Sequence, residues 1–206
     1  MNDIAQLDAR LDWNKSGGLL PAIVQDARSG AVLMLGYMNR DALAQTQSTG
    51  KVTFFSRSKQ RLWTKGESSG NFLTLKAIHA DCDNDTLLVL AEPAGPTCHL
   101  GTQSCFGAAS APALAFLGEL DVLIEQRERD RPEGSYTTTL FAGGVRRIAQ
   151  KVGEEGVETA LAAVAQDDAA LCGEVADLFF HALVLLRARS IPLHDVIAEL
   201  QRRHVR

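Results

Sequence analysis

The chain has 206 residues, enough for one large domain or two small ones. With 46% hydrophobic and 22% charged residues, its composition is that of an ordinary soluble globular protein. A net charge of −4 and a pI near 5.7 argue against non-specific binding to nucleic acids or anionic membranes. The amino terminus is too polar for a signal peptide, and the longest apolar run, 178–186, is too short to span a bilayer. We therefore expect a cytoplasmic protein.

Short strands separated by glycine and polar turns are predicted up to about residue 106. Residues 19–26 and 31–38 flank a turn at 27–30, which is typical of a β-hairpin. Asn39 can cap a helix over 40–49 that Gly50 ends. Runs rich in β-branched and aromatic residues predict four more strands, at 52–56, 61–65, 72–80 and 86–92.

Beyond this point the pattern becomes helical. A segment of small residues with a proline, 107–113, is typical of a linker. Helices are predicted at 114–129, 140–165 and 168–189, and a last helix is predicted to open at 190–192. The pattern predicts two domains, 1–110 and 114–206: a β-rich, barrel-like domain with a short helix, followed by an all-α helical bundle.

Four cysteines in a cytoplasmic chain do not indicate a disulfide framework. Cys172 lies among alanines and leucines, where we expect a buried helical residue. Cys82, Cys98 and Cys105 suit zinc with one position left for water, although their spacing alone fits unremarkable cysteines equally well. His99 could be a fourth zinc ligand or a nearby base.

The stretch "DCDND" places three carboxylates at alternate positions around Cys82. In an extended segment Asp81, Asp83 and Asp85 would point to one side and Cys82 to the other. Three such carboxylates repel one another unless a cation or solvent intervenes. A solvated acidic turn is the plain alternative. An EF-hand loop is excluded because Thr86 stands where that loop needs glycine.

The stretch "RLWTKGESSG", residues 61–70, has features useful for binding phosphate. Its glycines permit close backbone approach, Lys65 offers a charge, and Ser68 and Ser69 offer hydroxyl groups. A polar hairpin loop explains the same residues, so this pattern is a weak signal by itself.

Together the motifs "YMNRDAL", "LWTKGESSG", "DCDND", "CH" and "SC" resemble the phosphoribosyl-AMP cyclohydrolase family of histidine biosynthesis, in the family's order, over about residues 13–106. The resemblance implies zinc bound by the three cysteines, with ligands contributed across a homodimer interface. It implies magnesium bound by the three aspartates, with His99 near the reacting water. The substrate-binding candidates are Arg61, Trp63, Lys65, Glu67, Ser68 and Ser69.

The same resemblance implies the reaction. Phosphoribosyl-AMP would undergo hydrolytic opening of its adenine ring between N1 and C6. By analogy, the attack at C6 would come from a zinc-bound hydroxide.

In the helical half, carboxylates recur at helical spacing. Glu154 and Glu155 lie four and three residues before Glu158, so they share a face with it. Glu174 and Asp177 line one side of the next helix together with His181. That helix is apolar on almost every other side, so we expect it to be buried and its carboxylates to be paired or bound to metal. The plain alternative is an exposed acidic stripe.

The stretches "SYTTTLFAGGVRRIAQKVGEEGVETALAA" and "EVADLFFHALVLL" resemble the phosphoribosyl-ATP pyrophosphohydrolases, which are all-α nucleotide pyrophosphohydrolases, over about residues 114–194. The resemblance implies magnesium bound through oxygen ligands, with Lys151, Arg146 and Arg147 as candidate phosphate contacts. Glu155 is also the catalytic candidate of this half. The metal-ligand candidates are Glu154, Glu155, Glu158, Glu174 and Asp177.

The sequence thus indicates a bifunctional enzyme of histidine biosynthesis. Its second domain would release pyrophosphate from phosphoribosyl-ATP, and its first would open the ring of the resulting phosphoribosyl-AMP. One alternative is a house-cleaning pyrophosphohydrolase for damaged nucleotides with a zinc-stabilised accessory domain. Another is a non-enzymatic zinc-stabilised binding module.

Overall fold

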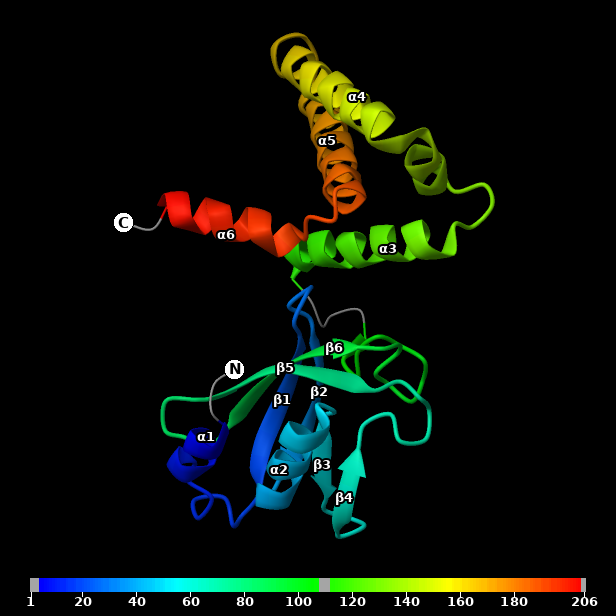
Figure 1. Ribbon diagram of the computed structural model, residues 1–206. Helices are drawn as coiled ribbons and strands as arrows, with labels where there is room; N and C mark the ends of the chain where they lie inside the picture. The colour runs from blue at the N-terminus through cyan, green and yellow to red at the C-terminus, as the bar shows by residue number, and fades with distance from the viewer. Residues whose placement is uncertain (1–3, 108–111, 205–206) are drawn as a thin grey trace. The chain divides into compact units, whose positions relative to one another are not determined.

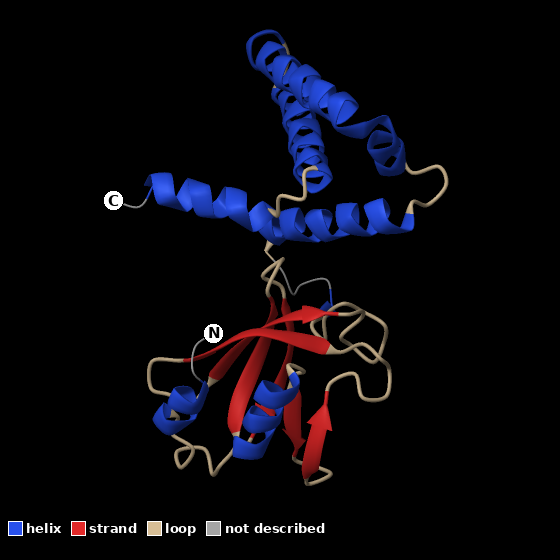
Figure 2. Cartoon of the chain, viewed as in Figure 1, coloured by secondary structure: helices blue, strands red, loops and turns tan. Residues whose placement is uncertain are grey.

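The computed structural model describes residues 4–107 and 112–204. The chain divides into two compact units, Met1–Gly118 and Glu119–Arg206. The first contains the strands and the second is helical, which confirms the predicted two-part organisation (Figure 1, Figure 2). Most of the predicted linker, 108–111, lies outside the described residues, so the predicted limits 1–110 and 114–206 stay a prediction.

The first unit contains an open four-stranded sheet of order β2-β1-β6-β5 and a separate two-stranded sheet, β3-β4. In the larger sheet β1 and β6 are parallel, and the pairs β1–β2 and β5–β6 are antiparallel. The strands are β1 (Leu20–Asp26), β2 (Val32–Met38), β3 (Thr53–Ser56), β4 (Arg61–Thr64), β5 (Leu73–Ala80) and β6 (Leu87–Pro93). The prediction of a barrel was wrong, because closure requires the two outer strands of a sheet to pair and β2 does not pair with β5.

The core of this unit follows from alternation along the central strands. In β1 and β6 buried positions alternate with partly exposed ones, so one face of the sheet is fully covered. Helix α2 (Arg40–Thr49) contributes Leu43 to the same core as Phe54. The helix begins and ends where predicted. The Asn39 side chain accepts a hydrogen bond from the Ala42 backbone amide at 2.8 Å, and Gly50 adopts a left-handed backbone conformation, with φ 67°. Helix α1 (Ile4–Arg10) was not predicted.

The second unit is built around two long helices. Helix α4 (Tyr136–Ala165) packs against α5 (Asp168–Ala188). A short 3-10 turn, Ala113–Ala115, leads into α3 (Phe116–Asp130), and α6 (Leu193–His204) follows α5. Helix α4 begins four residues before its predicted start because Ser135 caps it, and it is kinked at Gly144, with φ 74°. The small core consists of Ile124, Leu140, Ile148, Leu183 and Val184.

Helix α5 is more exposed than predicted. Only His181, Leu183 and Val184 are buried in it, while Cys172 and Asp177 are exposed. The predicted burial of these two residues was therefore wrong for the single chain. On length and composition alone α5 could cross a membrane, a test that the core helix of a soluble protein also passes.

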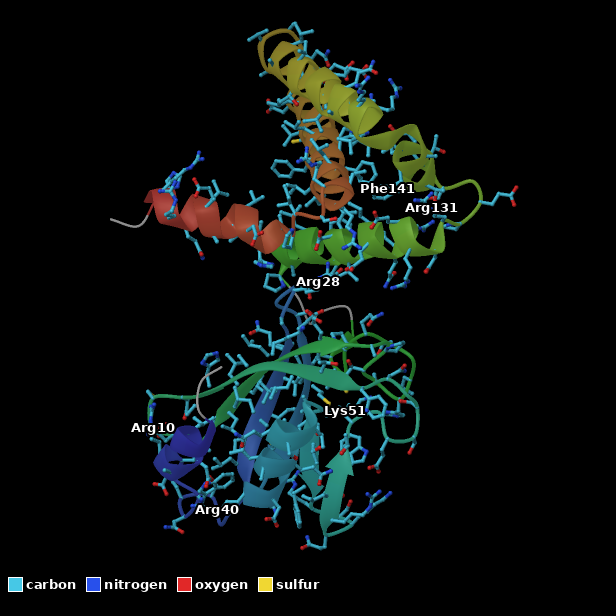
Figure 3. All side chains as sticks on the ribbon, viewed as in Figure 1. Arg10, Arg28, Arg40, Lys51, Arg131 and Phe141 are labelled. Carbon is cyan, nitrogen blue, oxygen red and sulfur yellow. The ribbon has the colours of Figure 1, made fainter. Side chains whose placement is uncertain are left out.

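The loop after β4 is folded tightly against the segment that leads into β5. Gly66 has φ +92°, and a Cβ atom there would lie 2.5 Å from backbone atoms of Asn71 and Phe72. Lys51, which Figure 3 labels, also lies beside this segment. Its ammonium is 3.7 Å from the centre of the Phe72 ring. Gly70 has a similar φ, +77°, but nothing lies within 4 Å of its Cβ position. Of these two glycines, close approach of backbone therefore constrains Gly66 and not Gly70.

We expect Gly66→Ala to destabilise the first unit more than Gly70→Ala does. Both substitutions carry the cost of a left-handed alanine, about 1–2 kcal/mol, and Gly66→Ala adds an overpacking cost of about 1–3 kcal/mol. Urea unfolding followed by tryptophan fluorescence measures this, because both tryptophans, Trp13 and Trp63, lie in the first unit. Equal free energies of unfolding for the two variants would contradict the account.

Candidate functional site

A cavity of about 500 Å³ lies in the first unit, between the loop after β4 and the loop after β6. Its volume falls in the range of small-molecule binding sites. Of the predicted substrate-binding residues, it is lined by Trp63, Lys65, Ser68 and Ser69. Cys98, His99 and Cys105 also line it, so the structure brings two predicted zinc ligands and the predicted catalytic histidine to one cavity.

Lys65 supplies a buried positive charge in this cavity. The residue is 8% exposed, and its Nζ lies 3.4 Å from the carbonyl oxygen of Asn71. Within the part of the chain that the structure describes, no carboxylate forms an ion pair with it. A buried ammonium without an anion is costly, so this site favours an anionic ligand.

The two thiols in the cavity are electrostatically coupled. The pKa of Cys98 is lowered, first by the backbone amide of Leu100 and then by the Thr102 side chain. The pKa of Cys105 is raised, first by burial and then by the neighbouring Cys98. A cation between the two sulfur atoms would stabilise both as thiolates, so this pair suits a metal ion.

Cys82 lies elsewhere, in the turn that joins β5 to β6. The β5–β6 ladder runs from Ala80 opposite Leu87 at this turn to Leu73 opposite Pro93 at the other end. At about 3.3 Å per residue, the two ends are roughly 20 Å apart. The loop with Cys98 and Cys105 follows Pro93, so it begins at the far end of the ladder (Figure 1). The structure therefore separates Cys82 from the other two cysteines within one chain.

The same β5–β6 turn holds the three aspartates. One oxygen from each of Asp81, Asp83 and Asp85 lies within 4.8 Å of the others. The segment is a turn, with Asn84 at φ 61°, so the predicted extended arrangement was wrong. Asp81 stabilises the turn, because its Oδ1 accepts hydrogen bonds from the backbone amides of Asp85 and Thr86, at 3.0 and 3.1 Å.

An ammonium group occupies this acidic turn. Lys15 Nζ pairs with Asp83 and, at 2.5 Å, with Asp85. The segment that carries it is attached to the turn, because the Asp12 amide donates to the Asn84 carbonyl at 2.8 Å. The Lys15 hydrogen bond lowers the pKa of Asp83. The turn therefore already attracts a cation.

In the second unit, Glu155 and Glu158 on α4 and Glu174 on α5 each place a carboxylate oxygen within 4.8 Å of the others. Glu155 is 4% exposed and lies 2.7 Å from Lys151 Nζ. The pKa of Glu158 is raised, first by burial and then by the charges of Glu155 and Glu174. This mutual repulsion is what a divalent cation with oxygen ligands would relieve.

Six predicted site residues lie outside these groups. The Glu154 carboxylate accepts a hydrogen bond from the Gln150 side-chain amide at 2.7 Å and pairs with Lys151 Nζ at 2.9 Å. The Asp177 carboxylate is not part of the three-carboxylate cluster. Arg61 and Glu67 pair with each other at 2.9 Å and do not line the cavity. Arg146 and Arg147 are exposed on α4.

Sequence reasoning missed several residues at both sites. Asn71 and Thr97 line the cavity, and the buried Thr97 hydroxyl has no hydrogen-bond partner among the described residues. Adjacency to Cys98 was the available signal for Thr97. Tyr136 contacts His181 beside Glu155, and no pattern in the sequence connects these two distant residues.

Comparison with known proteins gives the same division of the chain. A family model of phosphoribosyl-AMP cyclohydrolase matches residues 34–107, and one of phosphoribosyl-ATP pyrophosphohydrolase matches residues 117–204.

Relatives match nearly the whole chain. The histidine biosynthesis bifunctional protein HisIE of Xanthomonas axonopodis pv. citri (strain 306) is 67% identical, over 98% of each chain. The protein of that name from Xylella fastidiosa (strain Temecula1) is 64% identical over 98% of this chain and 96% of its own. The protein of that name from Escherichia coli (strain K12) is 60% identical over 94% of this chain and 95% of its own. The chain therefore belongs to the family of bifunctional histidine-biosynthesis hydrolases, in which a phosphoribosyl-AMP cyclohydrolase precedes a phosphoribosyl-ATP pyrophosphohydrolase in one polypeptide.

Proposed function

We propose that the adenine ring of phosphoribosyl-AMP is opened in the cavity lined by Cys98, and that phosphoribosyl-ATP is cleaved at the carboxylates of α4 and α5. The observation that carries the proposal is the separation of two donor sets, a pair of thiols in the cavity of the first unit and a cluster of three glutamates on α4 and α5 of the second. A house-cleaning pyrophosphohydrolase or a binding module is less well supported, because both catalytic families match.

Zinc fits the cavity through the chemistry of its donors. Cys98 and Cys105 offer two sulfur ligands there, and zinc commonly takes three protein ligands in catalytic sites. Zinc, when bound, lowers the pKa of a coordinated water to about 7. Lys65, Ser68 and Ser69 would hold a substrate phosphate. His99 would transfer the proton, since imidazole is the side chain suited to proton transfer near neutral pH.

The third zinc ligand, Cys82, would come from a second copy of the chain. The β5–β6 ladder keeps Cys82 from reaching its own chain's Cys98, which supports a homodimer with zinc at the interface. In a two-fold dimer each chain would give Cys82 to its partner and receive the partner's Cys82 in return. Association is further supported by apolar side chains exposed along α4: Val157, Leu161 and Val164.

Magnesium fits both carboxylate groups, because it prefers oxygen ligands and keeps positions for water and phosphate. In the first unit Asp81, Asp83 and Asp85 would hold it, and Lys15 would have to leave. In the second unit Glu155, Glu158 and Glu174 would hold it, and Lys151 would contact substrate phosphate. The proposal thus includes zinc and magnesium as cofactors, phosphoribosyl-ATP and phosphoribosyl-AMP as substrates, and a cytoplasmic location for the protein.

We expect Glu155→Ala to abolish pyrophosphate release from phosphoribosyl-ATP but to leave ring opening of supplied phosphoribosyl-AMP intact. Cys98→Ala should do the reverse. The assay follows pyrophosphate release and the ultraviolet change on ring opening in parallel.

The matched controls are Glu154→Ala, whose carboxylate lies outside the cluster, and Cys172→Ala, whose thiol is exposed on α5. Each should lose less activity than its test variant. Loss of both activities in either test variant would contradict the assignment of separate sites.

A shared zinc site predicts complementation between two inactive variants. Cys82→Ala and Cys98→Ala should each lose ring opening, and refolding them together should restore about a quarter of the wild-type activity. Half of the randomly paired dimers would be mixed, and each mixed dimer would have one intact site of two.

The control is the pair Cys98→Ala and Cys105→Ala, which share one side of the interface, so their mixed dimers have no intact site. Recovery in this control, or none in the test pair despite proven subunit exchange, would rule out the shared arrangement.

A further inference from the structure

Glu155 lies at one end of a chain of polar contacts that continues through α5 to the start of α4. Its Oε1 is 2.7 Å from Lys151 Nζ and 3.5 Å from His181 Nδ1. His181 Nε2 in turn lies 3.0 Å from the hydroxyl of Tyr136. Glu155 and His181 are 4% and 3% exposed, so these two side chains are almost entirely removed from solvent, whereas Tyr136 is exposed.

The hydrogen bonds determine which nitrogen of His181 carries the proton. Nδ1 lies 2.8 Å from the backbone carbonyl oxygen of Asp177, which can only accept, so Nδ1 must donate. In the neutral ring Nε2 is then an acceptor, and the Tyr136 hydroxyl donates to it.

Aromatic packing holds the same ring in place. The ring of His181 meets Tyr136 edge-on, with centroids 5.9 Å apart, and Phe180 at 5.2 Å. Two hydrogen bonds and two ring contacts thus fix an imidazole whose N–H lies beside Glu155.

This geometry resembles the support that metal-ligand side chains receive in other proteins. Ligand carboxylates are commonly oriented by a second hydrogen-bonding group, whose loss weakens metal binding. The Lys151 ammonium is shared between Glu155 and Glu154, which lies 2.9 Å from it. His181 is buried, already oriented, and close to the Glu155 oxygen.

We propose that His181, oriented by Tyr136 and by its Nδ1–H bond to the Asp177 carbonyl, is a positioning residue of the pyrophosphohydrolase site. The same N–H, 3.5 Å from Glu155 Oε1, would attract that carboxylate as a second, longer contact and so favour one placement of it for a divalent cation. This inference rests on the proposed metal site at Glu155, Glu158 and Glu174. His181 would touch neither substrate nor metal and would act through Glu155.

The test compares His181→Asn with His181→Gln, since an Asn amide can take the place of Nδ1 and a Gln amide that of Nε2. Mn²⁺ binding would be measured by titration calorimetry on the full chain, in an Asp83→Asn background that removes the acidic turn as a second site. We expect His181→Asn to bind Mn²⁺ nearly as the parent does. His181→Gln should lose about tenfold in affinity.

Activity should separate positioning from a merely structural role. His181→Gln should lose pyrophosphate release at limiting Mn²⁺ and regain most of it at saturating Mn²⁺. Tyr136→Phe should weaken Mn²⁺ binding less than His181→Gln does. Phe180→Leu, which removes a ring contact and no hydrogen bond, should lower the Tm and leave Mn²⁺ affinity unchanged.

Equal Mn²⁺ affinities for His181→Asn and His181→Gln, whether retained or lost, would overturn the inference. A Glu158→Gln variant in the same background distinguishes failure of the metal site itself. If Glu158→Gln leaves Mn²⁺ binding unchanged, the carboxylate cluster is not the metal site and both proposals fail.

Discussion

Repulsion among closely spaced carboxylates is the constraint on which both candidate magnesium sites depend. In each unit three carboxylate oxygens lie within 4.8 Å of one another, and a nearby cation favours the charged form of such groups. In each site a lysine supplies a positive charge: Lys15 at the β5–β6 turn and Lys151 on α4. The fold therefore places internal cations where we propose that magnesium binds, and magnesium would compete with Lys15 for Asp83 and Asp85.

The sheet of the first unit imposes a second constraint, which concerns distance. The β5–β6 ladder holds Cys82 at one end, while the loop that carries Cys98 starts from the other. The cavity with Lys65 and two thiols has the chemistry to bind an anionic nucleotide, yet one chain supplies only two sulfur ligands there. A homodimer would complete the site without any rearrangement of the sheet.

Local sequence signals predicted much of the fold. Asn39 and Gly50 determine the ends of α2, and alternation along β1 and β6 identified the strands, because these signals act within a few residues. Sheet order and the burial of Asp177 depend on which distant elements pack together, so the barrel and the buried α5 were predicted wrongly. Helical spacing alone brings Glu155 and Glu158 to one face of α4. Glu174 joins them from α5, and the contact between Tyr136 and His181 joins residues 45 positions apart, so both depend on how the two helices pack.

The central claim is that the two units bind divalent cations at separate carboxylate clusters. Counting bound Mn²⁺ per chain by electron paramagnetic resonance, in the wild type and in Asp83→Asn and Glu158→Gln, tests it most directly. The account predicts two classes of bound Mn²⁺, with a different class lost in each variant. An unchanged number of bound ions in either variant would contradict it.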